Sequence, residues 1–388
     1  MADAEQLRDL IKKILAEKKC DGSEVKVVKF DSGGANYTSA LFRVTVSLPK
    51  DDDLHLFAKV AAFGESMREK INADWMYSTE QFVYTKLANI YEDLQLRHGV
   101  ENEHRYVFPK FFGLSSEHGN ETVVTEDLAA AGYVCYDRFR PMDWEYAAVS
   151  METLAKFHAL SFAYEKEHPE EFQKIAKDMQ YKIGSEENKS LESFWVQLVE
   201  GSLAVIREEN KDRVRKIVYD ENVMKNYNKP IDKIVLAHGD YRLSNLLFKK
   251  QDGRLQVVPV DYQLVHSGCP LNDVLYFITV GSDQQFRAKH FHQLIDYYYE
   301  QLAMALERFS LDIVDVYPRE VFNKELKEKL PHMLLLGVMI LPAVTVEADA
   351  APKMGNEIDV STFIFKTNKL YAERFNGIID DCIEWGVI

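Results

Sequence analysis

The chain has 388 residues, and its 47 basic and 62 acidic side chains give a formal net charge of −15. Hydrophobic residues make up 46% of the chain and charged residues 28%, a balance typical of globular rather than disordered or coiled-coil proteins. This length predicts two or three domains of roughly 100 to 200 residues each. The acidic surplus argues against nucleic acid or an anionic membrane as the main partner, because either requires a basic face.

From the sequence we expect neither an export signal nor a membrane span. The first ten residues indicate an amphipathic helix and lack the apolar core of a secretory signal. The most apolar stretch, residues 333–341, is far shorter than the roughly 20 residues that span a bilayer, so we expect a buried helix there. No Cys-x-x-Cys pair occurs, so we expect reduced thiols and a cytoplasmic protein. The four cysteines are Cys20, Cys135, Cys269 and Cys382.

The first part of the chain predicts a small sheet with one helix packed on it. Runs of alternating polar and apolar residues indicate strands, and the first two are joined by a glycine-bearing turn. Helix-spaced apolar residues run over 74–94. The expected strands are 24–30, 39–48, 54–61, 106–114 and 121–126.

The second part of the chain is predicted to be mostly helical. From about residue 146 onward helical periods dominate, interrupted by strand-like runs at 234–237, 245–248 and 255–260. Together the two parts predict an α+β fold. We expect the first part to end at Asp127.

Three oxygen-bearing side chains lie at the ends of predicted strands in the second part. An apolar strand leads to Asp240, Asn245 follows five positions later, and a second apolar strand ends in Asp261. Mg²⁺ prefers carboxylate and amide oxygens, so Asn245 and Asp261 are candidate metal ligands. Asp240 is then available as a general base for an incoming hydroxyl, as in the kinase template. The alternative is that all three are turn residues, because Asp and Asn favour turns.

A glycine-bearing loop lies between the first two predicted strands. It contains Ser32, Gly33, Gly34 and Asn36. Glycines let backbone amides approach an anion closely, so a triphosphate could bind beneath this loop. An ordinary hairpin loop is the alternative.

Lys59 stands among apolar residues on the third predicted strand, and Glu80 follows on the predicted helix. A lysine that faces the interior needs a partner, because an unpaired charge away from water is costly. We therefore predict a Lys59–Glu80 pair in which Lys59 binds the α- and β-phosphates of a nucleotide. The alternative is two solvated surface charges.

Residues 126–128 end the last strand of the first part, where the chain would cross to the second part. Glu126 and Leu128 are candidates to present a backbone carbonyl and amide to an adenine ring. This assignment depends on position alone, because acidic residues are common in loops.

Three further polar residues are interpreted as structural. His158 lies on the apolar stripe of a predicted helix and is expected to be a hydrogen-bonded core histidine. His238 precedes the Asp240 turn and is expected to orient it. Asp273 begins an apolar helical run and is expected to cap its N-terminus.

In this order, these motifs resemble the protein-kinase-like small-molecule phosphotransferases, which include choline kinases and aminoglycoside phosphotransferases. Within that superfamily, four segments look like the ecdysteroid kinase-like proteins of insects: Asn36-Tyr37-x-Ser39, Thr125-Glu-Asp-Leu, Val260-Asp-Tyr-Gln-Leu-Val and Pro270-Leu-Asn-Asp-Val-Leu-Tyr-Phe. The resemblance covers nearly the whole chain. It implies a two-lobed protein-kinase-like fold, with a nucleotide-binding lobe at 1–127 and a catalytic and substrate-binding lobe at 128–388.

The sequence departs from related patterns in three respects. Arg242 stands where the ecdysteroid kinase-like family often has tryptophan. Compared with protein kinases, Gly239 replaces the arginine of the His-Arg-Asp motif, and only 12 positions separate Asp261 from Asp273. A long regulated activation loop does not fit in that interval.

The resemblance implies an ATP- and Mg²⁺-dependent kinase that phosphorylates a hydroxyl of a small apolar alcohol. The expected acceptor is the 22-hydroxyl of an ecdysteroid, giving an inactive steroid phosphate, and the expected state is a monomer. The alternatives are a choline- or aminoglycoside-type kinase, a metal-dependent phosphoesterase that uses His238, Asp240 and Asp261, and a non-catalytic lipid-binding module. A phosphoesterase would need further metal ligands and has no use for Lys59 paired with Glu80.

Overall fold

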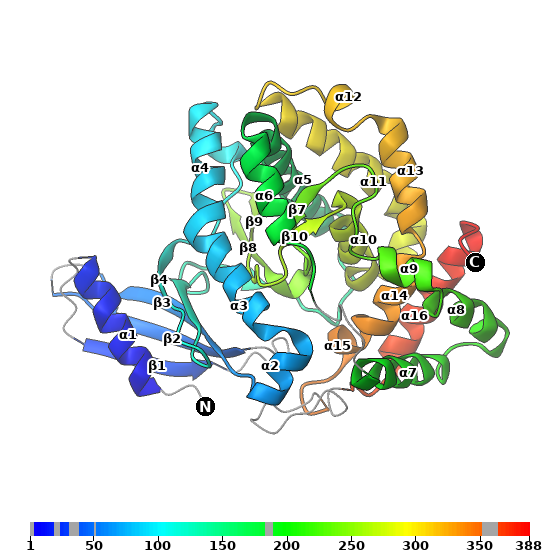
Figure 1. Cartoon of the computed structure of the whole chain (residues 1–388), viewed down its shortest axis with the longest axis horizontal. Coiled ribbons are helices and arrows are strands. Elements are labelled where there is room, and N and C mark those ends of the chain that lie inside the picture. The colour runs from blue at the N-terminus through cyan, green and yellow to red at the C-terminus, as the bar shows by residue number, and fades with distance from the viewer. Residues whose placement is uncertain (1–3, 19–23, 31–38, 50–51, 183–188, 351–363) are drawn as a thin grey trace.

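The computed structural model describes residues 4–18, 24–30, 39–49, 52–182, 189–350 and 364–388. Figure 1 shows two lobes, a small lobe built on a sheet and a larger, mostly helical lobe. The predicted α+β, two-lobed architecture is therefore confirmed.

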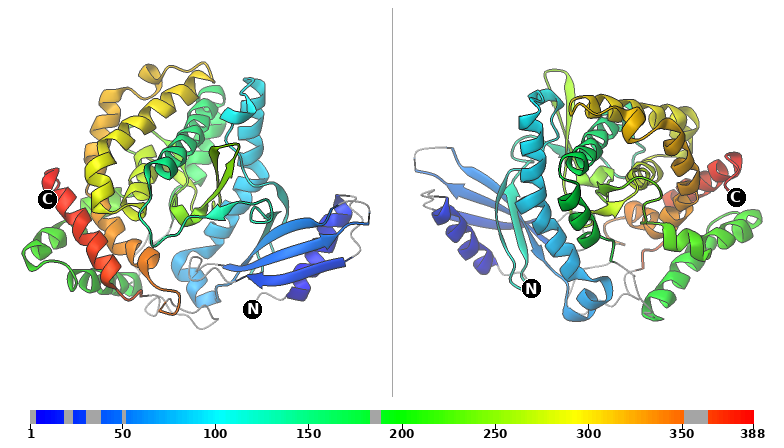
Figure 2. Two further views of the ribbon diagram at one scale, coloured as in Figure 1. Left: turned by 180° about the vertical axis from the view of Figure 1, so that it is seen from behind. Right: turned by 45° about the horizontal axis from the view of Figure 1, so that its top comes forward.

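The small lobe is a five-stranded antiparallel sheet with the strand order β1-β2-β3-β5-β4. Side chains alternate across a strand, so Leu56, Ala58 and Val60 point to one face of β3 and are buried there, while Lys59 points to the other face. Helix α1 (Ala4–Glu17) packs on the apolar face, as both views in Figure 2 show. The strands are β1 (Glu24–Phe30), β2 (Ser39–Ser47), β3 (Leu54–Ala61), β4 (Phe111–Ser115) and β5 (Thr122–Glu126).

The predicted helix of the first part is one segment of a longer helical rod between the lobes. The rod comprises α3 (Ala73–Phe82), the π-helical turn η1 (Val83–Leu87) and α4 (Ala88–Arg97). A shorter helix, α2 (Glu65–Ile71), precedes it and was not predicted. The apolar side chains of η1 and α4 belong to the core of the larger lobe, so this rod joins the two lobes. The division of the chain at residue 127 stays a prediction.

The larger lobe surrounds two central helices, α5 and α11, which pack together and run in the same direction, with a two-stranded and a three-stranded sheet on the side of the small lobe. Its helices are α5 (Trp144–Glu167), α6 (Pro169–Asp178), α7 (Lys189–Leu203), α8 (Lys211–Val218), α9 (Glu221–Asn226), α10 (Pro270–Gly281), α11 (Gln284–Glu307), α12 (Ile313–Val316), α13 (Arg319–Lys329), α14 (His332–Met339), α15 (Leu341–Thr345) and α16 (Lys369–Glu384). Its strands are β6 (Val134–Cys135), β7 (Val235–Ala237), β8 (Leu246–Gln251), β9 (Arg254–Pro259) and β10 (His266–Gly268).

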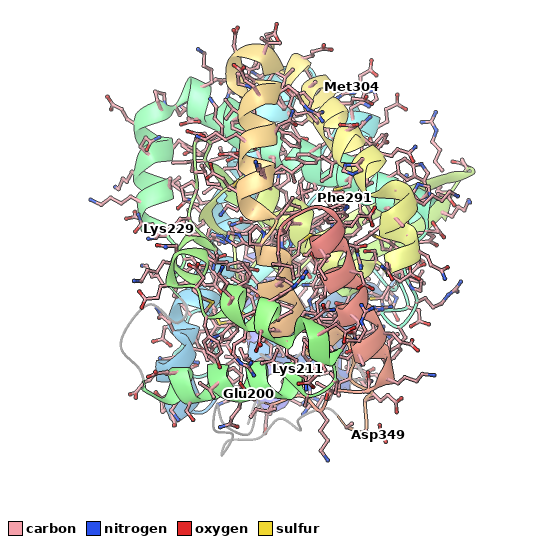
Figure 3. The ribbon with its side chains drawn as sticks, turned by 90° about the vertical axis from the view of Figure 1, so that its right-hand side faces the viewer. Glu200, Lys211, Lys229, Phe291, Met304 and Asp349 are labelled. Atoms are coloured by element: carbon pink, nitrogen blue, oxygen red, sulfur yellow. The ribbon has the colours of Figure 1, made fainter. Side chains whose placement is uncertain are left out.

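Aspartate side chains cap the N-termini of the two central helices, and a buried ion pair attaches the C-terminal helix to one of them. Asp143 and Asp283 cap α5 and α11 by accepting hydrogen bonds from backbone amides three residues later. Arg287 of α11 forms a buried ion pair with Asp381 of α16. Phe291, labelled in Figure 3, stacks on Trp385 with ring centroids 4.1 Å apart. These contacts hold α16 against α11.

The predicted strands agree closely with the structure except at β4. That strand begins at Phe111 rather than near residue 106, because Pro109 cannot donate a ladder hydrogen bond. The apolar stretch 333–341 is helical as predicted, in α14 and the start of α15. Among the described residues, no helix combines the length and the apolar composition needed to cross a bilayer.

His332, at the start of α14, predicts acid sensitivity of the fold. Burial first, and then the charge of Lys329, lowers the pKa of His332 to about 3. An unfolded histidine titrates near 6.5, so between about pH 6.5 and 3 the unfolded chain binds one more proton than the folded chain at this site. Stability is therefore lost as the pH falls through this window, by about 1.4 kcal/mol per pH unit from this residue.

We expect His332→Gln to remove this contribution. Urea unfolding between pH 6 and pH 4 should show a shallower loss of unfolding free energy for the variant than for the parent chain. His292→Gln, at an exposed position of α11, is the control and should keep the parent slope. Equal slopes for His332→Gln and the parent chain would contradict the prediction.

Candidate active site

The segment that carries Asp240 leaves the buried strand β7 through a turn that only glycine fits. Gly239 has φ +81°, and a Cβ atom there would lie 2.2 Å from the carbonyl oxygen of Leu264. This close approach brings the turn after β7 against the segment that follows Asp261. It explains why glycine stands where protein kinases have arginine.

Asp273 fixes this turn by hydrogen bonds to its backbone. The prediction that Asp273 caps the N-terminus of its helix was wrong. Helix α10 begins at Pro270, so Asp273 lies inside its first turn and its side chain points to the segment after β7. Its carboxylate accepts hydrogen bonds from the backbone amides of His238 (2.6 Å) and Gly239 (2.8 Å). Burial raises the pKa of Asp273, but the hydrogen bond from His158 and the further partners outweigh burial and leave it lowered. A charged carboxylate thus fixes the backbone next to Asp240.

The two histidines near this turn are buried. His158 is hydrogen-bonded through both ring nitrogens, to Tyr298 at 2.7 Å and to Asp273 at 3.0 Å, as predicted for a core histidine. His238 packs against Tyr262, with ring centroids 5.0 Å apart. Burial lowers the pKa of His238, so its ring is neutral near pH 7 and is suited to packing beneath the turn.

Three side chains hold the carboxylate of Asp240. Oδ1 accepts hydrogen bonds from the Tyr276 hydroxyl at 2.5 Å and from Arg242 Nε at 3.0 Å. Oδ2 accepts one from Asn245 Nδ2 at 2.7 Å. A carboxylate has about four acceptor positions, so one further donor can still bind.

Sequence reasoning missed Tyr276 and the contact of Arg242 with Asp240. Tyr276 follows Asp273 by three positions on α10, and side chains three apart share one face of a helix. That spacing was the available signal. Arg242 follows Asp240 by two positions on extended backbone, where alternate side chains share a face.

Asn245 and Asp261 lie side by side because β8 and β9 pair next to them. Leu246 pairs with Pro259, and the amide of Val260 donates to the carbonyl of Asn245 at 2.9 Å. Asp261 has φ +69°, a left-handed conformation that is uncommon for a residue with a side chain. Amide and carboxylate oxygens are the ligand types that suit a hard divalent cation, so Asn245 and Asp261 are residues that could hold one.

The predicted ion pair between Lys59 and Glu80 is present, and Asp261 joins it. Lys59 Nζ lies 2.9 Å from Glu80 Oε2 and 2.5 Å from Asp261 Oδ1. Burial by itself lowers the pKa of Lys59, but the charges of Asp261 and Glu80 outweigh it and raise the pKa above the ordinary value. Lys59 therefore stays charged, and it connects β3, α3 and the end of β9 across the two lobes.

The other residues predicted to contact a nucleotide are Glu126, Leu128 and the residues of the predicted phosphate loop. The Glu126 side chain accepts a hydrogen bond from the amide of Lys110 at 2.7 Å, so it braces the chain at the end of β5. Leu128 is buried at the crossing between the lobes, and its carbonyl accepts from the amide of Tyr133 at 2.9 Å. The predicted phosphate loop lies outside the described residues. It comprises Ser32, Gly33, Gly34 and Asn36.

Comparison with models of known protein families shows which family the chain belongs to. The model of the ecdysteroid kinase-like family matches residues 33–311, which include Lys59, Asp240 and Asp261. The chain belongs to the ecdysteroid kinase-like family. Membership identifies it as a small-molecule kinase, an enzyme that phosphorylates an alcohol group.

Solved structures similar to this ecdysteroid kinase-like protein include two named enzymes. One is an aminoglycoside-3'-phosphotransferase of type VIII, with 16% identity, 77% of this chain and 98% of that chain covered, and a TM-score of 0.37. The other is a microcompartment-associated aminopropanol kinase, with 10% identity, 97% and 98% coverage, and a TM-score of 0.37. A comparison with curated proteins finds no match.

The turn before Asp240 gives a testable prediction about Gly239. Gly239→Ala places a methyl group against the Leu264 carbonyl, so we expect a marked loss of stability together with loss of turnover. Gly253→Ala is a matched control, because Gly253 has φ +77° but nothing within 4 Å of its Cβ position. The control should lose only about 1 to 2 kcal/mol from the left-handed conformation. Thermal unfolding and kinase assays compare the two; similar losses would show that the contact with Leu264 is unimportant.

Proposed function

We propose that this protein transfers the γ-phosphoryl group of ATP, with Mg²⁺, to a hydroxyl of a small apolar alcohol. The most specific form of the proposal is the 22-hydroxyl of an ecdysteroid, giving an inactive steroid phosphate. The observation that carries it is the contact of Lys59 with both Glu80 and Asp261 beside the Asp240–Asn245 pair. A cytoplasmic location accords with this proposal, because ATP is abundant there.

On the nucleotide side, Lys59 is the proposed ligand of the α- and β-phosphates, with Glu80 holding its ammonium group. Asn245 and Asp261 are the proposed Mg²⁺ ligands; the bound ion supplies positive charge that neutralises the phosphate oxygens. Glu126 and Leu128 mark the backbone proposed to contact the adenine ring. The proposed phosphate loop contributes backbone amides from Ser32, Gly33, Gly34 and Asn36.

On the acceptor side, Asp240 orients the alcohol and takes its proton. The oxygen of the alcohol forms a bond to the γ-phosphorus, the bond from that phosphorus to the β-phosphate oxygen breaks, and the proton passes to Asp240. Phosphoryl transfer has a loose transition state, so positioning and charge stabilisation provide most of the rate. The three hydrogen bonds that hold Asp240 supply that positioning.

Aromatic side chains near Asp240 support an apolar acceptor. Tyr276 donates directly to Asp240. Burial and then the charge of Asp240 raise the pKa of Tyr181 to about 12, and Tyr181 packs edge-on against Trp75 with centroids 5.7 Å apart. Tyrosine offers a large apolar surface with one polar tip, which suits a rigid skeleton that carries hydroxyl groups.

The phosphoesterase alternative receives no support from the metal-ligating groups. Among the described residues, the clusters of three His, Cys, Asp or Glu side chains close enough to share an ion include neither Asp240 nor Asp261. A two-metal hydrolytic site would require such a cluster at these aspartates. The two clusters are Asp74-His118-Glu121 and Glu101-Glu103-His104.

Asp240→Asn tests the general base. The variant keeps a similar shape but cannot accept the proton, so we expect turnover to fall by about 10²- to 10⁴-fold while nucleotide binding persists. Mass spectrometry of products from ATP, Mg²⁺ and ecdysone, with choline and an aminoglycoside as rival acceptors, measures both activity and selectivity. Asp252→Asn in the exposed turn between β8 and β9 is the control and should be unchanged. Near-normal turnover in Asp240→Asn would show that the base assignment is wrong.

Lys59→Ala tests the nucleotide site. Removal of the ammonium group leaves the buried Glu80 and the largely shielded Asp261 without this partner, so we expect weaker ATP binding together with a loss of about 3 to 5 kcal/mol of stability. Calorimetric titration with ATP and urea unfolding measure the two effects. Lys29→Ala, on an exposed part of β1, is the control. Unchanged ATP affinity and rate in Lys59→Ala would remove the small lobe from the proposed nucleotide site.

A further inference from the structure

Arg242 lies beside Asp240, and both side chains are largely shielded from solvent. The backbone at Arg242 is extended, with φ −140° and ψ 158°, so its side chain shares a face with Asp240 while Tyr241 points into the core. The Arg242 side chain is 12% exposed, and its Nε donates to Asp240 Oδ1 at 3.0 Å. A guanidinium that is largely shielded from water needs a negatively charged partner, and Asp240 is one.

The guanidinium of Arg242 is paired with Asp240 and also feels the charge of Asp261. Burial by itself lowers the pKa of Arg242, but the charges of Asp240 and Asp261 contribute to a net increase. Arg242 is therefore close to both the candidate base and a candidate metal ligand. Two cations of the described residues lie at this site. Lys59 is paired with the carboxylates of Glu80 and Asp261, and Arg242 is paired with Asp240.

We propose that Arg242 is a catalytic residue that binds the γ-phosphoryl group during transfer while its Nε stays on Asp240. This inference rests on the proposed function. Arginine carries five donors in a planar fork, so one side chain can bridge a carboxylate and a phosphate. The bridge fixes the acceptor-orienting carboxylate relative to the phosphorus atom that the acceptor attacks.

The bridge has a defined place in the reaction. As the bond from the γ-phosphorus to the β-phosphate oxygen breaks and the bond to the acceptor oxygen forms, negative charge is spread over the equatorial oxygens of the phosphoryl group. Arg242 stabilises that charge, and the acceptor proton passes to Asp240. The stabilisation is greatest in the transition state, so it raises kcat more than it tightens ATP binding.

Tyr276 provides a matched comparison, because it also donates to Asp240 Oδ1 but carries no charge for a phosphate. The probe is ADP with Mg²⁺ and aluminium fluoride, which mimics the transferring phosphoryl group; calorimetry measures its affinity and that of ADP alone. We expect Arg242→Gln to weaken binding of the probe by about 10- to 100-fold, with little change for ADP alone. Tyr276→Phe should lower turnover but keep both affinities.

Arg242→Lys is a second test in case Arg242→Gln fails to fold, because it keeps the positive charge. Lysine keeps the charge but lacks the planar fork, so we expect it to recover only part of the affinity for the probe and part of kcat. Equal probe affinities in the parent chain, Arg242→Gln and Tyr276→Phe would overturn the inference, and so would parental probe affinity and kcat in Arg242→Lys. Failure of the parent chain to phosphorylate any alcohol with ATP would instead overturn the proposed function.

Discussion

The shared ion pair of Lys59 with Glu80 and Asp261 is the interaction on which the site depends. A buried ammonium group is costly unless carboxylates pair with it, and here two carboxylates from different parts of the chain do so. Because Lys59 lies on β3, Glu80 on α3 and Asp261 after β9, one cation sets the position of the small lobe relative to the segment that carries Asp261.

The turn that carries Asp240 depends on buried polar groups that fix its backbone. Asp273 binds the amides of His238 and Gly239, and the close contact of Gly239 with Leu264 joins the turn to the segment after Asp261. Such satisfied networks are rigid, because breaking any one bond leaves a buried group unpaired. The carboxylate of Asp240 is thereby presented in one orientation.

Prediction from sequence succeeded where the pattern was local. The strands β1 and β3 were predicted with their observed bounds, because largely alternating or apolar runs bounded by polar and glycine-bearing segments are a local signal. Membership of the ecdysteroid kinase-like family agrees with the motifs around Lys59, Asp240 and Asp261. The capping role expected for Asp273 was wrong, because its nearest polar partners come from a turn 34 and 35 positions earlier. The roles assigned to the individual site residues stay predictions.

The sequence by itself determined which chemical groups the chain carries, their order, and the strands and helices that present them, since periodicity and turn preferences act over a few residues. Only the tertiary structure decided that Lys59 is shared by two carboxylates and that Tyr276 and Arg242 both hold Asp240. The physical reason is that partners of a buried polar group are chosen by packing between distant segments. Local propensity carries no information about which side chains meet there.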